Sequence, residues 1–166
     1  AEQSVNKNDL SLRFPTPHEQ QVLNEAADRN IDPAWAFAMM RQESVFMADA
    51  RSPVGALGLM QLMPQTGRQV ARSLNKRLPS SRTLLDANTN IRFGITYLRS
   101  VLDTFNENPV LATAAYNAGG HRVKNWLPEK RVLPADIWVE TVPFYETRNY
   151  LQNVFAYTVV YDYRLN

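Results

Sequence analysis

Apolar side chains recur at helical spacing along most of this chain. Residues 34–40 are apolar almost all round, which is typical of a helix buried on most of its sides. Residues 91–105 and 151–159 each place apolar residues three or four positions apart, which predicts longer helices with one buried face. Convincing alternation of apolar and polar residues is missing, so the pattern predicts an all-α protein.

Prolines and capping residues mark the ends of the predicted helices. Pro33, Pro64 and Pro109 each stand at the first position of a helix, where a backbone N–H is not needed, and Gly119 is the expected C-terminal cap of the last of these three. The predicted helices span approximately residues 17–29, 33–44, 64–73, 87–105, 109–118, a short segment ending before 128, another short segment after 134, and 144–163. Between residues 74 and 85 a small hairpin is an open alternative.

The chain is long enough to form a domain with its own core. Its 166 residues compare with about 150 for a typical domain, and 45% hydrophobic and 20% charged residues are usual for a globular protein. Residues 1–10 are polar and are expected to be a loose arm or the remnant of a preceding domain, whereas residues 11–166 should form the folded domain. Because the chain begins with neither Met nor a leader segment, we expect a processed protein or a part of a longer one.

Composition and motifs exclude several classes of function. The longest apolar run has seven residues, far short of the roughly 18 that span a bilayer, so no membrane span is expected. Without cysteine there is no disulfide, thiolate metal site or cysteine nucleophile. The net charge is +2 and the basic residues are scattered, which suits a weakly anionic substrate and not a nucleic acid. Metal-binding and phosphate-binding motifs are missing, so we expect no metal and no cofactor.

One carboxylate stands on an apolar helix face. Glu43 follows Ala36, Met39 and Met40 at same-face spacings, near the C-terminal end of its helix. Burial and the negative end of the helix dipole both disfavour the ion, so we expect a raised pKa for Glu43, as a general acid near neutral pH requires. The alternative is a solvated glutamate at a frayed helix end.

The stretch after Glu43 predicts a tight, non-helical loop. Three of the six glycines, Gly55, Gly58 and Gly67, fall in or just after residues 52–64. Such a loop brings backbone and side chains close to the end of the Glu43 helix.

Three separated motifs resemble the catalytic domain of the soluble lytic murein transglycosylases, which belong to the lysozyme-like superfamily. The motifs are Glu43-Ser44 followed by Ser52, Gly-Leu-Met-Gln-Leu-Met-Pro at 58–64, and Ala-Tyr-Asn-Ala-Gly at 115–119. The resemblance covers about residues 14–163 and includes Pro-Phe-Tyr-Glu-Thr-Arg-Asn-Tyr at 143–150. It departs from the family at Gly120-His121, where Pro-Gly is common, so the geometry of that turn is left open.

The resemblance implies a role for each matched position. Glu43 would be the single catalytic acid and base, and Tyr116 the tyrosine whose hydroxyl contacts its carboxylate. Ser44 is the motif serine, whose simplest role is to cap the helix end. The other matched positions would bind the glycan: Ser52, Gln61, Met63, Asn117, Glu146 and Tyr150. Taken singly, the tyrosines and Met63 are as typical of a core, and Asp49, the nearest further carboxylate, fits an exposed turn.

A single special carboxylate is consistent with substrate-assisted chemistry. By resemblance, the N-acetyl group of N-acetylmuramic acid is the internal nucleophile, and Glu43 acts as acid and then as base on the 6-hydroxyl, which leaves a 1,6-anhydro end. The implied partner is a peptidoglycan glycan strand in the periplasm, and a preceding helical scaffold domain in the full-length protein is a further expectation. Two alternatives stay open: a muramidase of the goose-lysozyme kind, and a non-catalytic wall-binding module.

Overall fold

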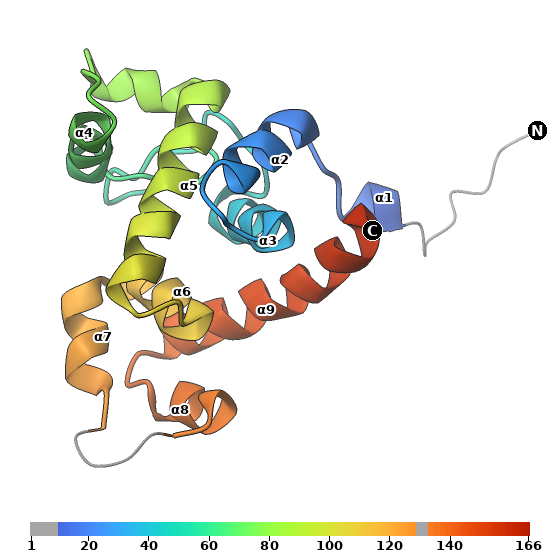
Figure 1. Ribbon diagram of the computed structural model, residues 1–166, viewed down its shortest axis with the longest axis vertical. Helices are drawn as coiled ribbons and strands as arrows, with labels where there is room; N and C mark the ends of the chain where they lie inside the picture. The colour runs from blue at the N-terminus through green and yellow to red at the C-terminus, as the bar shows by residue number, and fades with distance from the viewer. Residues whose placement is uncertain (1–9, 129–132) are drawn as a thin grey trace, which may run out of the picture.

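The computed structural model describes residues 10–128 and 133–166. Within these ranges the regular elements are helices, so the all-α prediction is confirmed (Figure 1). In chain order they are α1 (Leu10–Arg13), α2 (Glu19–Ala27), α3 (Pro33–Ser44), α4 (Pro64–Ser73), the 3-10 helix η1 (Ser81–Leu85), α5 (Ala87–Thr104), α6 (Pro109–Ala118), α7 (Gly120–Trp126), α8 (Ala135–Thr141) and α9 (Tyr145–Leu165). None of these helices is long and apolar enough to cross a membrane. The arm predicted at residues 1–10 lies, apart from Leu10, outside the described residues.

Side-chain caps and prolines set where the central helices begin. Asp32 Oδ1 accepts a hydrogen bond of 2.8 Å from Ala34 N, and Pro33 is the first residue of α3. Asn108 caps α6 in the same way, directly before Pro109. The predicted boundaries of α3, α4 and α6 are therefore confirmed, because each start is specified by local chemistry.

Helix α2 begins two residues later than predicted. His18 has a φ of 57°, in the left-handed region, so the helix begins at Glu19 and not at Pro17. The hydroxyl of Thr16 donates to Glu19 Oε2 over 2.5 Å and caps no backbone N–H. Thr16 therefore stabilises the turn before the helix.

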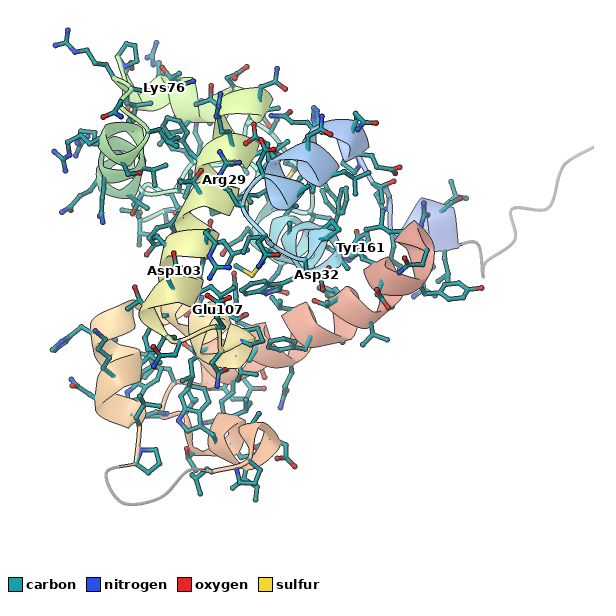
Figure 2. The ribbon with its side chains drawn as sticks, viewed as in Figure 1. Arg29, Asp32, Lys76, Asp103, Glu107 and Tyr161 are labelled. Atoms are coloured by element: carbon teal, nitrogen blue, oxygen red, sulfur yellow. The ribbon has the colours of Figure 1, made fainter. Side chains whose placement is uncertain are left out.

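Helix α3 forms the centre of the main core. Helix α9 packs along it, and α2, α5 and α6 complete the cluster around the two (Figure 1). Tyr161 of α9 lies beside α3, where its ring stacks on Phe37 with the centroids 5.4 Å apart (Figure 2). Phe37, Met39 and Met40 are 0% exposed. Since burial of each such side chain contributes about 1.5–3 kcal/mol, the helix that carries Glu43 is firmly held.

A smaller apolar cluster lies between α4, η1 and α5. Its buried members are Leu57, Leu62, Val70, Ala71, Leu84 and Phe93. The structure does not contain the hairpin considered between residues 74 and 85, because residues 81–85 form η1 and no strand is found there. Leu84 is 0% exposed and lies so close to Gly67 that a Cβ on the glycine would be 2.9 Å from its Cδ1. The leucines of this stretch thus fill a cluster and do not alternate across a strand pair.

Candidate active site

Glu43 lies in the last turn of α3, one residue before the helix ends. Its side chain is partly exposed, and the buried Tyr150 of α9 donates a hydrogen bond of 2.5 Å to Oε1. Burial raises the pKa of Glu43 to about 7, against the lowering effect of the Tyr150 hydrogen bond and with a further rise from the charge of Glu146. The predicted rise is confirmed. A carboxyl with this pKa can both donate and accept a proton near neutral pH.

The chain leaves α3 through two strained residues. Val45 has a φ of 49° and Phe46 a φ of 64°, although a β-branched residue rarely occupies the left-handed region. Val45 N still donates to Arg41 O over 3.0 Å, so the helix closes before the chain turns. These two residues end the helix directly after Glu43.

Ser44 joins the helix end to the following loop, residues 45–63, here called the 45–63 loop. Its Oγ donates to Leu59 O over 2.8 Å and to Met40 O over 3.2 Å, and the residue is 4% exposed. Ser44 therefore does more than cap the helix, because its stronger hydrogen bond fixes the loop against the end of α3.

Ser52 and Gln61, two of the predicted substrate-binding residues, shape the 45–63 loop. Ser52 Oγ accepts a hydrogen bond of 2.9 Å from Ala56 N. Gln61 Nε2 donates to Gly58 O over 2.8 Å and to a second carbonyl of the loop over 3.3 Å. Both side chains are thus held by the backbone of their own loop. Their contact with a substrate stays a prediction.

The structure corrects the expected partner of the candidate carboxylate. The hydroxyl of Tyr116 donates to Met60 O over 2.8 Å, and the hydroxyl bonded to Glu43 is that of Tyr150. Helix α9 packs along α3 and so brings Tyr150 to Glu43, whereas α6 presents Tyr116 to the 45–63 loop. Tyr116 still belongs to the site, because burial and then the charge of Glu43 raise the pKa of its hydroxyl well above the usual value.

Asn117 and Glu146 lie where α6 meets the start of α9. Thr147 Oγ1 donates to Asn117 Oδ1 over 2.8 Å, and Thr147 is 1% exposed, so this hydrogen bond joins the two helices. Glu146 is exposed and lies one turn before Tyr150 on α9. Its charge raises the pKa of Glu43, so the two residues belong to the same site.

The predicted residues fall into two groups. A first group is linked by hydrogen bonding or charge: Glu43, Tyr116, Glu146 and Tyr150. The second group lies in the 45–63 loop and in α6: Ser52, Gln61, Met63 and Asn117. Met63 stands at the beginning of α4 and is 41% exposed, so it is available to a ligand.

Asn90 of α5 is 0% exposed and was not among the residues predicted for the site. Its side chain makes three hydrogen bonds, two of them with the backbone of the 45–63 loop at Leu57 and Met60. Asn90 shares one face of α5 with Gly94 and Leu98, so a polar residue on an apolar stripe was the available signal. The same kind of signal drew attention to Glu43.

The remaining polar candidates lie at the surface. Asp49 is exposed, in agreement with the exposed turn expected there. His121 is also exposed, with Nε2 3.4 Å from Asn125 Nδ2. Gly119, at a φ of 89°, ends α6 and Gly120 begins α7 directly, which shows how this chain turns without Pro-Gly. Among the residues described, no group of three or more acidic or histidine side chains is placed to hold a metal ion.

This all-α fold carries one carboxyl of raised pKa among the residues that the structure describes, and the fold is that of a known enzyme class. The chain belongs to the transglycosylase SLT domain family, whose model matches residues 21–139. The model of the soluble lytic transglycosylase helical domain matches residues 141–166. The soluble lytic murein transglycosylase of Escherichia coli K12 is 39% identical over 156 residues, which cover 93% of this chain and 24% of that protein. A putative soluble lytic murein transglycosylase of Haemophilus influenzae is 38% identical, and the matched region covers 92% of this chain and 26% of that protein.

Two solved structures have the same fold as this chain and match it over nearly its whole length. The lytic transglycosylase Slt of Pseudomonas aeruginosa, solved as an inactive glutamate-to-glutamine mutant, superposes with a TM-score of 0.92 at 49% identity, over 98% of this chain and 26% of that one. The 70-kDa soluble lytic transglycosylase of Escherichia coli gives a TM-score of 0.89 at 38% identity, over 95% and 26% of the two chains. The chain thus spans about a quarter of the length of these relatives.

Proposed function

We propose that residues 11–166 form the catalytic domain of a peptidoglycan lytic transglycosylase. The enzyme cleaves the bond between N-acetylmuramic acid and N-acetylglucosamine and leaves a 1,6-anhydro end. The observation that carries the proposal is the carboxyl of Glu43. Burial raises its pKa to about 7, and it accepts a hydrogen bond from the Tyr150 hydroxyl. Membership of the family and the names of the relatives, lytic murein transglycosylases, support the substrate and the reaction class.

In the first step Glu43 acts as the acid. Its protonated carboxyl donates a proton to the glycosidic oxygen, and the electron pair of the broken C1–O bond stays on that oxygen. The carbonyl oxygen of the substrate's own N-acetyl group bonds to C1 in its place. The pKa of about 7 supports this step, because a substantial fraction of Glu43 is protonated near neutral pH.

In the second step the same residue acts as the base. The carboxylate of Glu43 takes the proton of the 6-hydroxyl, O6 bonds to C1, and the bond from C1 to the acetyl oxygen breaks. Burial favours the acid and the Tyr150 hydrogen bond favours the carboxylate, and these opposing effects leave both forms accessible at one pH. One carboxyl can therefore serve both steps.

Residues around Glu43 supply the binding surface. We assign glycan contacts to Ser52, Gln61, Met63, Asn117, Glu146 and Tyr150. The net charge of +2 suits a polymer that carries peptide and lactyl carboxylates. A peptidoglycan substrate supports a periplasmic location, and the large unmatched part of the relatives supports the helical scaffold expected in the full-length protein.

The test is turnover of purified peptidoglycan sacculi by the wild type and by Glu43→Gln. The substitution keeps the volume and removes the proton, so release of soluble fragments should fall by at least about a hundredfold while glycan binding persists. The matched control is Glu140→Gln, because Glu140 is exposed and lies on α8. This variant should release fragments at the wild-type rate. Near-normal turnover by Glu43→Gln would overturn the assignment. A wild type that binds sacculi without releasing fragments would favour the non-catalytic wall-binding alternative.

A further inference from the structure

Asn90 is a buried amide that uses both of its N–H donors and its carbonyl oxygen on backbone groups. Its Oδ1 accepts from Met60 N over 2.7 Å, and its Nδ2 donates to Leu57 O over 2.9 Å and to Leu84 O over 2.7 Å. An apolar residue of the same size would take these hydrogen bonds from Met60 N and Leu84 O, and would leave Leu57 O only the one that it accepts from Leu62 N over 3.0 Å. Asn90 therefore fixes the 45–63 loop to α5 and to η1 together.

Two glycines allow the loop to approach Asn90 this closely. A Cβ on Gly58, whose φ is 78°, would lie 2.3 Å from Asn90 Nδ2 and 2.4 Å from Leu84 O. A Cβ on Gly94, one turn after Asn90 on α5, would lie 2.2 Å from Met60 Sδ. The backbone and the side chain of Met60 are thus both seated on the same face of α5.

The peptide groups of Met60 connect this seat to the site of Glu43. The amide N–H of Met60 binds Asn90, while its carbonyl accepts the hydrogen bond of 2.8 Å from the Tyr116 hydroxyl. Tyr97, seven residues after Asn90 on α5, packs its ring against that of Tyr116 with the centroids 5.1 Å apart. One face of α5 therefore holds Tyr116 both through Met60 and by direct ring contact.

We propose that Asn90 is a positioning residue of the active site, which acts through Met60 to hold the Tyr116 hydroxyl beside Glu43. The inference rests on the proposed function for its kinetic readout. Asn90 touches neither the substrate nor Glu43 in this account. Its effect on turnover passes through the Met60 carbonyl and the Tyr116 hydroxyl.

A double-mutant cycle between Asn90 and Tyr116 tests this. In Asn90→Asp an oxygen replaces Nδ2 and faces the carbonyls of Leu57 and Leu84, so the loop should shift. We expect kcat to fall roughly tenfold or more with little change in KM, which is the sign of a group that acts in the transition state. In a Tyr116→Phe background, which lacks the hydroxyl, the same substitution should lower kcat by less than about threefold. Equal losses in both backgrounds would overturn the proposal.

The control separates positioning from general stability. Leu102→Ala, three turns further along α5, removes a core side chain that is 7% exposed and lies outside the 45–63 loop. This variant should be less stable but should keep the wild-type kcat at temperatures where it is folded. A kcat loss in Leu102→Ala as large as that in Asn90→Asp would mean that general destabilisation explains both.

A second variant covers the case in which Asn90→Asp does not fold or the wild type has no turnover. Gly94→Ala displaces Met60 by pressing on its side chain, and it adds no charge. We expect the titration of Glu43, followed by carbon NMR of its carboxyl, to move toward the ordinary glutamate pKa, because a displaced Tyr116 admits water. The shift should be absent when Tyr116→Phe is already present. An unchanged Glu43 titration in folded Gly94→Ala would overturn the inference, whereas absent wild-type turnover alone would overturn only the proposed function.

Discussion

The hydroxyl of Tyr150 is bonded to the carboxylate of Glu43 over 2.5 Å, although the two residues are 107 positions apart in the chain. The distance is that of a charge-assisted O–H···O⁻ hydrogen bond. It stabilises the ion, while burial among the residues of α3 and α9 destabilises it, and the balance lies at a pKa of about 7. The acid strength of Glu43 is therefore adjustable in either direction by single substitutions around it.

Removal of the Tyr150 hydroxyl should make Glu43 a weaker acid. Tyr150→Phe loses a hydrogen bond that favours the carboxylate, so the pKa of Glu43 should rise above about 7. The basic limb of the pH dependence of kcat should move to higher pH, and kcat should fall because the carboxyl is no longer oriented. The measurement is the rate of cleavage of a soluble glycan fragment across the pH range.

Tyr161→Phe is the control for this experiment. It removes another α9 hydroxyl, which donates to Pro15 O over 3.2 Å and lies about three turns after Tyr150. Its pH profile should match that of the wild type. A basic limb that stays in place in folded Tyr150→Phe would show that a group other than Glu43 controls it.

Neutralisation of Glu146 should act in the opposite sense. The negative charge of Glu146 raises the pKa of Glu43, so Glu146→Gln should lower that pKa and move the basic limb to lower pH. Since Glu146 is exposed, the shift should shrink as the salt concentration rises. The exposed Glu140 offers the matched control, Glu140→Gln, whose profile should not move. A salt-independent shift of the same size in both variants would contradict the account.

The raised pKa of Glu43 should also appear in the pH dependence of stability. Between about 4.5 and about 7 the folded state holds a proton that the unfolded state has lost, so the free energy of unfolding should fall as the pH rises through this window. Glu43→Gln does not titrate. It should therefore be more stable than the wild type above pH 7, by up to about 3 kcal/mol, and lose this advantage toward pH 4. Urea denaturation at pH 4 and pH 8 checks this, and a difference that is the same at both would refute it.

The link between Ser44 and the 45–63 loop should contribute measurably to stability. Ser44→Ala leaves the buried Leu59 carbonyl without its side-chain donor, which should lower the free energy of unfolding by about 1–3 kcal/mol. Ser100→Ala removes an exposed hydroxyl that donates to Tyr97 O, and should change stability by less than about 0.5 kcal/mol. The measurement is the thermal unfolding of both variants. Equal midpoint temperatures for the two would contradict the role given to Ser44.

Local chemistry explains how much of the fold could be predicted from the sequence. Asp32 before Pro33, and Asn108 before Pro109, specify helix starts within a few residues, and those starts are found as predicted. The start of α2 was missed because His18 adopts a left-handed conformation that the capping pattern does not reveal. The apolar stretch around Leu84 was ambiguous, because its leucines could fill a cluster or a strand pair and only tertiary packing decides.

In the candidate site, too, features set by local sequence could be predicted and features set by tertiary packing could not. The raised pKa of Glu43 was predictable, because its largest cause is burial, and the apolar face of α3 indicates that burial. Which tyrosine reaches Glu43 depends on how α9 packs along α3, and this placed Tyr150 where Tyr116 was expected. Asn90 carried a signal, a polar residue on an apolar stripe, but its partners lie on the loop before α4 and on η1, which periodicity cannot locate.

The most direct test of the central claim is the mass of the muropeptides that the chain releases from purified peptidoglycan. If Glu43 removes the proton of the 6-hydroxyl, each new muramic acid end is a 1,6-anhydro ring. The mass of this end is lower than that of the reducing sugar by one water. Digestion in ¹⁸O-labelled water should then leave no label in these ends. Reducing ends that carry the label would show that water is the nucleophile and that the chain is a hydrolytic muramidase, in contradiction to the account.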